Sequence, residues 1–353
     1  MTYPPALSRL LVAVGLACSA PVRAAVTTLD VAAADTPRAA WLERYTEARQ
    51  GPEQTDRFVE TYRVGRDAAL DLSNLSGHVR VTGGSGSEIR VEAVKRVRSR
   101  DDDNARRLLE DLRIEVTQVG SRVEVRTLYP RTSGRMSGSV DYTVSVPASA
   151  AVSVKSVSGD VSVGSVNGEV RAETVSGDLQ VSSTPNLVVA KTVSGDVTAR
   201  DIGTATALTL ASVSGNVIAT DLKVRTLEAG TVSGDVQLTG VQVERLTAKS
   251  VSGNIDFDAT IARGGRYEFN SHSGNVRILL AGNVGFELDA NTFSGSIRSD
   301  FPVTLRSNTD NDREPRGRGG RGASNRTIRG AYGDASAVLS IRSFSGSVVI
   351  SKR

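Results

Sequence analysis

The chain has 353 residues, with 43 Lys and Arg against 39 Asp and Glu and a formal net charge of +4. So small a net charge predicts no general nucleic-acid-binding field, and an aromatic content of 4% argues against stacking platforms for bases or sugars. The single cysteine excludes a disulfide within the chain, so the fold must depend on its backbone hydrogen bonds and its apolar core.

Residues 1–24 have the pattern of a secretory signal peptide. A short basic start ends at Arg9, residues 10–17 form an apolar core, and the small residues around Ala24 offer a cleavage site. The apolar run is too short for a permanent transmembrane helix, and no later stretch qualifies. Cleavage leaves a chain without a thiol, hence without cysteine-based metal or redox chemistry. The alternative is a lipoprotein acylated at Cys18, although the leucine before it lies one position too close for a good lipidation box.

Between this signal and the repeats we expect a flexible lead over residues 25–55 and a β-rich cap over residues 56–147. Within the cap, residues 70–81 show the pattern of the later repeats once, with Ser76 and Gly77 in a turn. Further strands are expected at 58–64, 89–94, 114–119, 123–128 and 140–146, and a helix over 105–112 capped by Asp102 or Asp103. Such a cap shields the open edge of the first repeat, which every solenoid needs.

A turn motif, Ser-Gly followed by Asp, Asn or Ser, then recurs through the second half of the chain. Its serines are Ser158, Ser176, Ser194, Ser214, Ser233, Ser252, Ser273, Ser294 and Ser345. The steps between them are 18, 18, 20, 19, 19, 21, 21 and 51 residues. So regular a period predicts a stack of identical units rather than a compact enzyme around one pocket.

Apolar residues alternate with polar ones on both sides of each turn, which predicts strands with one buried face. Two columns precede the turn: Val154, Ala172, Ala190, Leu210, Ala229, Ala248, Phe269, Ala290, Ile341 and Val152, Val170, Val188, Leu208, Leu227, Leu246, Tyr267, Leu288, Leu339. The unit is therefore strand, tight turn, strand and return connection, and we expect an all-β, parallel β-helix-like solenoid with two sheets. The turn glycine suits a type II turn with positive φ.

A third inward column is polar and holds Ser156, Thr174, Thr192, Ser212, Thr231, Ser250, Ser271, Thr292 and Ser343. We expect these hydroxyls to bond to one another or to the turn backbone rather than to a ligand.

The repeats extend over residues 148–300, a loop insertion occupies 301–337, and 338–353 form the final rung. The insertion carries the low-complexity segment 316–322, rich in Arg and Gly. Arg316, Arg318 and Arg321 are candidate contacts to anionic surface polymers or lipid head groups, while a solvated loop is the simpler interpretation.

Several segments resemble a bacterial family of proposed adhesins, the domain of unknown function numbered 4097, over roughly residues 65–353. These segments are 72–81, 140–147, the serial Val-Ser-Gly-Asp-Val rungs and 332–350. The resemblance implies an exported β-solenoid at the cell envelope and transfers no catalytic residue. This chain departs from the usual Val before the turn at His272, Phe293 and Phe344, which bears on surface contacts near the last rungs.

A calcium site and a glycoside-cleaving site are the two kinds of chemistry that the acidic residues of this chain could supply. The residues after the turn glycines (Asp160, Asp178, Asp196, Asn216, Asp235, Asn254 and Asn275) could offer oxygen ligands to calcium, but Asn replaces Asp repeatedly, so turn formation explains them better. A polysaccharide lyase or hydrolase needs a convergent pair of acids, whereas the acids here follow the repeat or lie in loops. His78 and His272 are the only histidines, and His272 fits a surface contact better than a general base.

The sequence therefore predicts a non-catalytic, exported solenoid that binds or scaffolds at the envelope, with no cofactor, metal or nucleic acid. The partner is a protein or polysaccharide of the periplasm or cell surface. A carbohydrate-active enzyme is the alternative, and an ice-binding face is disfavoured because the Ser and Thr column points inward.

Overall fold

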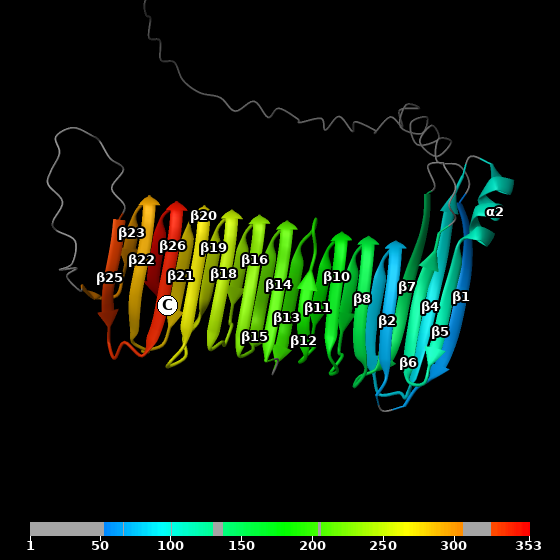
Figure 1. Ribbon diagram of the computed structural model, residues 1–353, viewed down its shortest axis with the longest axis horizontal. Coiled ribbons are helices and arrows are strands. Elements are labelled where there is room, and N and C mark those ends of the chain that lie inside the picture. Colours follow the sequence, from blue (N-terminus) through cyan, green and yellow to red (C-terminus); the bar gives the residue numbers. More distant parts are fainter. Residues whose placement is uncertain (1–52, 66, 100, 130–136, 204–205, 306–325) are drawn as a thin grey trace, which may run out of the picture. The chain divides into compact units, whose positions relative to one another are not determined.

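The computed structural model describes residues 53–353 except 66, 100, 130–136, 204–205 and 306–325. These residues form a two-sheet β-solenoid, as predicted, with one 13-stranded and one 14-stranded sheet. Figure 1 shows the strands stacked side by side in nearly chain order. The expected signal peptide and most of the expected lead lie outside the described residues. Among the described residues, no helix combines the length and apolarity that crossing a bilayer requires.

Each rung consists of one strand of the 14-stranded sheet, a Ser-Gly turn and one strand of the 13-stranded sheet. The rungs are β2 (Ala69–Ser76) with β3 (Val79–Gly84), β8 (Ala151–Ser158) with β9 (Val161–Gly164), β10 (Val170–Ser176) with β11 (Leu179–Ser182), β12 (Leu187–Lys191) with β13 (Val197–Gly203), β14 (Ala207–Ser214) with β15 (Val217–Lys223), β16 (Thr226–Ser233) with β17 (Val236–Thr239), β18 (Arg245–Ser252) with β19 (Ile255–Thr260), β20 (Arg266–Ser273) with β21 (Val276–Ala281), β22 (Phe286–Ser294) with β23 (Ile297–Ser299), and β26 (Ala337–Ser345) with β27 (Val348–Lys352). Neighbouring rungs pair in parallel, for example Leu227 with Leu246.

The inward columns form one continuous core. The predicted apolar positions before the turn are buried, with one exception at residue 188. A register shift after Val170 places Leu187 opposite it, so Leu187 is buried and Val188 is only partly covered. The prediction of Val188 as a core residue was therefore wrong by one position.

The turn glycines stack directly on one another along the solenoid. Gly215 has φ +148°. This φ lies beyond the roughly +80° of a type II turn, in the extended region that only glycine adopts readily. A Cβ on Gly215 would lie 2.0 Å from the carbonyl oxygen of Gly195 in the preceding rung. Glycine is therefore required at this position for two reasons, the backbone angle φ and the short distance to the preceding rung.

The inward hydroxyls bond mainly to these glycine carbonyls, one of the two arrangements predicted for them. Thr231 Oγ1 donates to Gly215 O at 2.8 Å, and Ser212 Oγ donates to Gly195 O at 2.9 Å. The buried hydroxyls of Ser156, Thr174 and Ser343 have no hydrogen-bond partner in the described part. The column therefore ties one rung to the next rather than facing a ligand.

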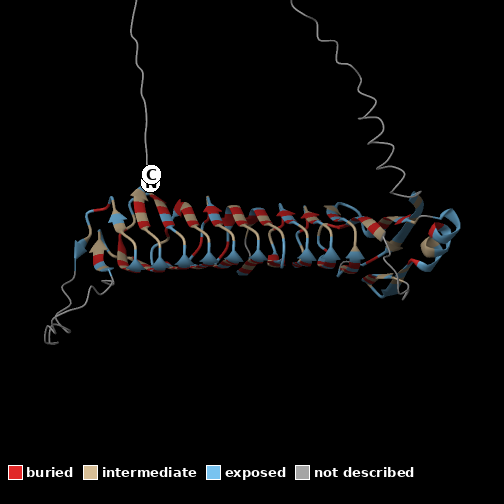
Figure 2. Ribbon diagram, turned by 90° about the horizontal axis from the view of Figure 1, so that it is seen from above, coloured by how far each residue is buried: buried red, intermediate tan, exposed pale blue. Residues whose placement is uncertain are grey.

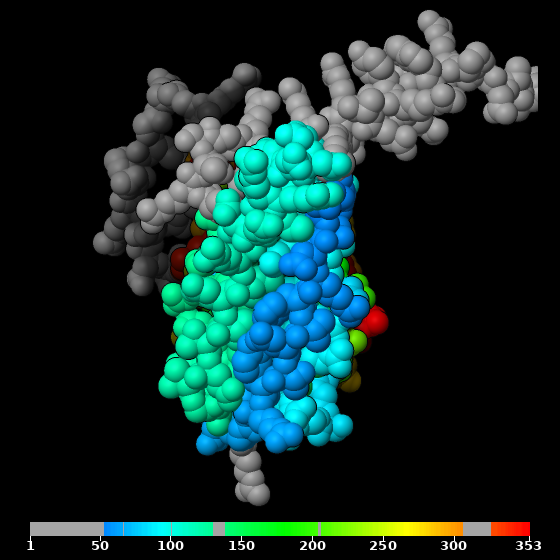
Figure 3. Space-filling model, turned by 90° about the vertical axis from the view of Figure 1, so that its right-hand side faces the viewer, coloured from blue at the N-terminus to red at the C-terminus, as the bar shows by residue number. Residues whose placement is uncertain are grey.

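The N-terminal cap closes one end of the stack with antiparallel strands. It contains β1 (Glu53–Arg63), β4 (Glu88–Arg98), β5 (Arg113–Val119), β6 (Arg122–Leu128), β7 (Ser137–Pro147) and α2 (Asp102–Asp111). Strands β6 and β7 continue the parallel stack below β2 and β3, and β5, β4 and β1 add antiparallel edges. The cap of α2 is Asp101, whose side chain accepts from the backbone of Asp103, and not the predicted Asp102 or Asp103. Figure 3 shows β1 (blue) and later cap residues (cyan to green) covering this end.

A buried polar cluster joins the cap to the first rung. Asn74 occupies the hydroxyl column there, and its side-chain amide donates to Val140 O at 2.9 Å. Thr127 Oγ1 donates to Asn74 Oδ1 and also lies 2.7 Å from the hydroxyl of Tyr142. Burial raises the pKa of Tyr142 to about 12, and it raises that of Tyr129, whose hydroxyl donates to Ser76 O, to about 12.

The opposite end departs from chain order. The rung β26–β27 was expected last, but it lies between β20–β21 and β22–β23, as the red β26 between β20 and β22 shows in Figure 1. Part of the segment expected as a loop, β25 (Arg326–Tyr332), is a strand antiparallel to β22, and β24 (Thr304–Leu305) pairs with it. Phe286, Phe301 and Tyr332 pack together at this end, with ring centroids 4.9–5.5 Å apart.

Candidate functional site

A stripe of exposed side chains extends along the stack beside the turns. It is formed by the residue directly before each turn serine, and we call it the exposed ladder. In spatial order its members are Leu75, Val157, Val175, Val193, Val213, Val232, Val251, His272, Phe344 and Phe293. The nine apolar members are 43–49% exposed. In Figure 2 the exposed ends of these strands form a row of pale blue arrowheads along one side of the turns.

The ladder points outward because of the strand period. In β16, Leu227, Ala229 and Thr231 are buried, so the alternation places Val232 on the solvent side. The following serines pair in register from rung to rung, Ser214 with Ser233 and Ser233 with Ser252, which keeps the ladder straight. An apolar surface of this length is therefore a property of the fold and not of one loop.

At one end the ladder becomes aromatic. The rings of His272 and Phe344 lie 4.9 Å apart and within 9° of parallel, and those of Phe344 and Phe293 lie 4.9 Å apart and within 5°. The centroid separation matches the ~4.8 Å between strands of a sheet. Phe344 stands in the middle because its rung lies between the other two. Each ring covers a face of its neighbour, so the stack presents ring edges to the solvent.

The predicted contact residues divide between this stack and the undescribed part of the chain. His272 belongs to the ladder, whereas Arg316, Arg318 and Arg321 lie outside the described residues. The other histidine, His78, lies at the first turn with Nδ1 3.4 Å from a carboxylate oxygen of Asp160. Both side chains of that pair are more than half exposed, which suits a surface contact.

The Asp and Asn column links successive rungs through hydrogen bonds to the backbone. The N–H of Asn216 donates to Asp196 Oδ1 at 2.7 Å, and the N–H of Asp235 donates to Asn216 Oδ1 at 2.9 Å. Asp and Asn both serve because the bond needs only one side-chain acceptor oxygen, which either residue supplies. Among the described residues no group of three or more His, Cys, Asp or Glu side chains is placed to hold a metal.

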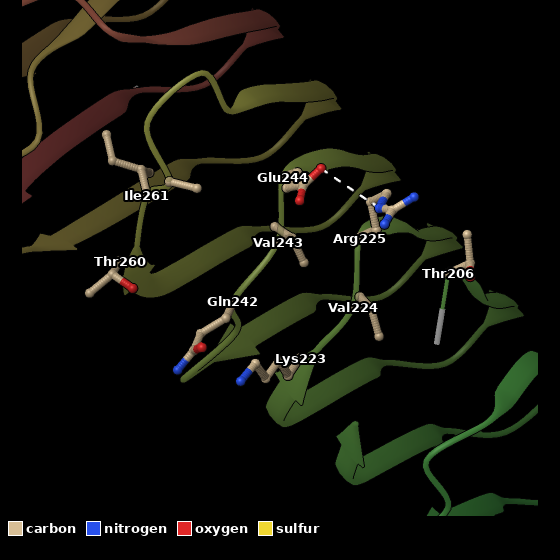
Figure 4. A pocket seen from close by; sticks show the side chains of 10 residues that line it. Thr206, Lys223, Val224, Arg225, Gln242, Val243, Glu244, Thr260 and Ile261 are labelled. Carbon is tan, nitrogen blue, oxygen red and sulfur yellow. Dashed lines mark ion pairs between the residues drawn. The ribbon is translucent and has the colours of Figure 1, made fainter. Parts of the chain in front are cut away.

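A cavity of about 410 Å³ lies on the side where the chain returns from one rung to the next. Its lining comes from residues 223–225, 242–244 and 260–262, with Thr206. Glu244 is the one carboxylate among these described lining residues, and it lies 3.9 Å from Arg225. Figure 4 shows these two side chains directed toward each other, with Lys223 and Gln242 at the other end of the cavity.

A second hollow of about 370 Å³ crosses the outer face of β2, β6 and β8. Its carboxylates each have an arginine partner: Arg122 Nε lies 2.6 Å from Asp71, and Arg126 contacts Glu124. The remaining cation of the lining, Lys155, precedes the ladder residue Val157 by two positions on the same strand. In both hollows each lining carboxylate thus has an arginine partner.

The model of a family described as Toastrack DUF4097 matches residues 68–338, from the first rung into β26. The chain belongs to this family. The match agrees with the resemblance found in the sequence and covers every repeated turn of this chain except the last.

Solved structures give distant matches to this chain. A proposed adhesin from Bacteroides fragilis is 15% identical, with a TM-score of 0.36, over 84% of this chain and 97% of its own. A proposed cell adhesion protein from Clostridium sporogenes is 10% identical, with a TM-score of 0.24, over 86% and 100%. A proposed lipid-binding protein from Parabacteroides distasonis is 11% identical, with a TM-score of 0.33, over 84% and 97%. No curated protein matches this chain.

The exposed ladder is the feature that sequence reasoning overlooked. The Val before each turn was recognised as a regular position, and only His272, Phe293 and Phe344 were connected with surface contacts. The signal was present in the strand period, since a residue next to an inward hydroxyl must face outward.

Proposed function

We propose that this chain is an exported, non-catalytic solenoid that binds or scaffolds a protein or polysaccharide of the cell envelope through its repeated outer faces. The observation that carries the proposal is the exposed ladder, a contiguous apolar stripe along the whole stack. Monomeric proteins rarely leave large contiguous apolar patches uncovered, and such patches mark interaction sites. Stacked repeats also present extended binding surfaces rather than enclosed pockets.

Export rests on residues 1–24, which have the pattern of a signal peptide. The proposal places the protein in the periplasm or at the cell surface, with acylation at Cys18 as the less favoured anchor. Most rungs of this stack need neither a thiol nor a metal to explain their contacts, because backbone pairing and apolar burial account for them.

A non-catalytic role is supported by the chemistry of the two hollows. Glycoside cleavage by the common mechanisms needs two carboxylates that face each other across the bond. The cavity of Figure 4 offers Glu244 beside Arg225, and the second hollow offers Asp71 and Glu124, each beside an arginine. Neither arrangement favours the polysaccharide lyase or hydrolase that the sequence left as an alternative.

The test combines fractionation with cross-linking in cells. A tagged chain carries a photo-reactive residue either at Val193, on the ladder, or at Gln180, which is exposed on the opposite sheet. We expect the protein in the envelope or periplasmic fraction, with cross-links to an envelope component from position 193 far exceeding those from position 180. A cytoplasmic location, equal cross-linking from both positions, or turnover of a polysaccharide by the purified protein would overturn the proposal.

A further inference from the structure

We propose that the exposed ladder binds a second copy of this chain, so that two solenoids lie side by side and parallel, related by a twofold axis along the ladder. This inference goes beyond the proposed function, because it concerns the ladder alone and holds whether or not the protein reaches the envelope. The second copy and the envelope partner compete for the ladder, so the pair is the state that the protein adopts when that partner is absent.

The area of the ladder suits such a pair. Nine apolar side chains that are each 43–49% exposed follow one another without a gap other than His272. Together they expose on the order of 700 Å², close to the ~800 Å² that each partner contributes to a standard protein interface. The same area is above the few hundred Å² at which an uncovered patch becomes unusual for a monomer.

The spacing of the ladder points to a partner with the same repeat. A surface that contacts every rung must place groups at the rung separation of ~4.8 Å over the whole stack. A second ladder supplies one contacting side chain per rung at this separation, and its small valines let the two stacks approach closely. In a parallel pair the aromatic end formed by His272, Phe344 and Phe293 meets its own counterpart.

Charges on the two flanks of the ladder decide between parallel and antiparallel association. On the sheet side, two residues before the ladder, four cations and one anion face the solvent: Lys155, Lys191, Lys249, Arg342 and Glu173. On the turn side, three residues after the ladder, the charged residues are acidic: Asp160, Asp178, Asp196 and Asp235. The ladder thus separates a mainly basic column from an acidic one.

Rotation about the ladder axis places the basic column of one copy against the acidic column of the other, with Lys155 near Asp160 and Lys191 near Asp196 of the second copy. Rotation about an axis across the ladder reverses the stack and, at full overlap, sets cations against each other on the basic flank. Lys155 then faces Arg342 and Lys191 faces Lys249 of the second copy, while each aspartate of the other flank faces Asn or Ser. Electrostatic complementarity selects register and orientation in this way. The parallel pair is therefore the favoured one, with Glu173 as its one unfavourable contact.

The association is tested with the purified full chain by sedimentation velocity over a range of concentrations. We expect a dimer at micromolar concentration. Val193→Lys combined with Val232→Lys should weaken it at least a hundredfold, because two half-exposed ladder residues become charged without entering the core. Gln180→Lys is the matched control and should leave the dimer unchanged. Unaltered circular dichroism and thermal unfolding show that the ladder variant is folded. If the ladder variant is not folded, Phe344→Ser replaces it, because the Phe344 ring lies on the ladder, half exposed and outside the core.

Orientation is tested by disulfide trapping in a Cys18→Ser background. Val157→Cys, near one end of the ladder, should cross-link two copies to each other, and Val213→Cys, near the middle, should do the same. Gln180→Cys should not. A monomeric wild type, or a dimer that survives the ladder variant, overturns the interface. Trapping at position 213 without trapping at position 157 overturns the parallel arrangement and indicates a reversed pair.

Discussion

Replacing one turn glycine by alanine should destabilise the solenoid about as much as truncating a large side chain of its core. Gly215→Ala places a methyl group 2.0 Å from the carbonyl oxygen of Gly195 and 2.5 Å from its carbonyl carbon. Carbon contacts are comfortable only at about 3.5–4.0 Å. The two rungs must therefore separate locally, and a φ of +148° is strained for alanine even in open space.

The cost follows from these two effects. Backbone strain of this kind is worth about 1–3 kcal/mol. Separation of these two rungs also weakens the bonds between them, such as Gly195 N–H to Ser214 O at 3.0 Å and Val197 N–H to Asn216 O at 2.9 Å. Each such bond contributes about 0.5–1.5 kcal/mol. We therefore expect Gly215→Ala to lower the free energy of unfolding by about 3–5 kcal/mol.

The matched control is Gly230→Ala, within strand β16 of the neighbouring rung. A Cβ at Gly230 would meet Lys249 O at 3.4 Å and Lys249 Cβ at 3.7 Å, which are ordinary contacts, and its φ is not in the left-handed region. Alanine there should be neutral or stabilise by up to about 1 kcal/mol, because it restricts the unfolded chain. Urea unfolding followed by far-UV circular dichroism measures both variants. Equal midpoints for Gly215→Ala and the wild type would refute the stacked-turn geometry.

Three further predictions concern the polar groups of the stack. Thr231→Val should destabilise by about 1 kcal/mol, whereas Thr174→Val, whose hydroxyl has no partner in the described part, should be neutral or stabilising; equal losses in urea unfolding would contradict this assignment. Asp196→Ala should cost about 1–3 kcal/mol by leaving the N–H of Asn216 without its acceptor, while Asp196→Asn should keep nearly full stability; thermal unfolding separates the two, and an equal loss for Asn would show that charge matters instead. Because the pKa of Tyr142 is raised to about 12 in the folded state, its contribution to the free energy of unfolding is complete below pH ~10 and is lost as the pH rises from about 10 through 12. The free energy of unfolding measured over this range should fall less steeply with pH for Tyr142→Phe than for the wild type. Identical pH slopes for the two proteins would contradict burial of the neutral phenol.

The strand pattern of the repeat could be predicted from sequence because each rung repeats the same alternation of apolar and polar positions. Apolar residues four and six places before the turn serine, as at Leu210 and Leu208, leave only one register that buries both. The failure at Val188 has a physical cause: Leu187, Val188 and Val189 are all apolar, so alternation cannot choose among them. The register shift after Val170 pairs Val170 with Leu187, so Leu187 is buried in place of Val188.

The order of the last rungs could not be predicted from the period. Every rung offers the same edge to its neighbour, so a rung reached after a 51-residue step can pair on either side of β22–β23. What distinguishes the two sides is the aromatic cluster of Phe286, Phe301 and Tyr332, which covers the outer end. These three residues are far apart in the sequence, and the strand that carries Tyr332 was hidden within an expected loop.

The candidate site was predicted only in part, for a related reason. His272 was recognised because it interrupts a row of valines, but a row of valines seen in sequence does not show that the row is uncovered. The aromatic stack depends on Phe344 standing between His272 and Phe293, which follows from the order of the rungs and not from their spacing.

Continuity of the exposed ladder, with Phe344 one rung before Phe293, is the claim on which the binding surface depends. Pulsed electron-spin measurements on Val157→Cys paired with Phe344→Cys or with Phe293→Cys, in a Cys18→Ser background diluted with unlabelled protein, test it directly. Counting seven and eight rungs of ~4.8 Å, we expect roughly 34 Å to position 344 and roughly 38 Å to position 293. A longer distance to position 344 than to position 293 would contradict the account.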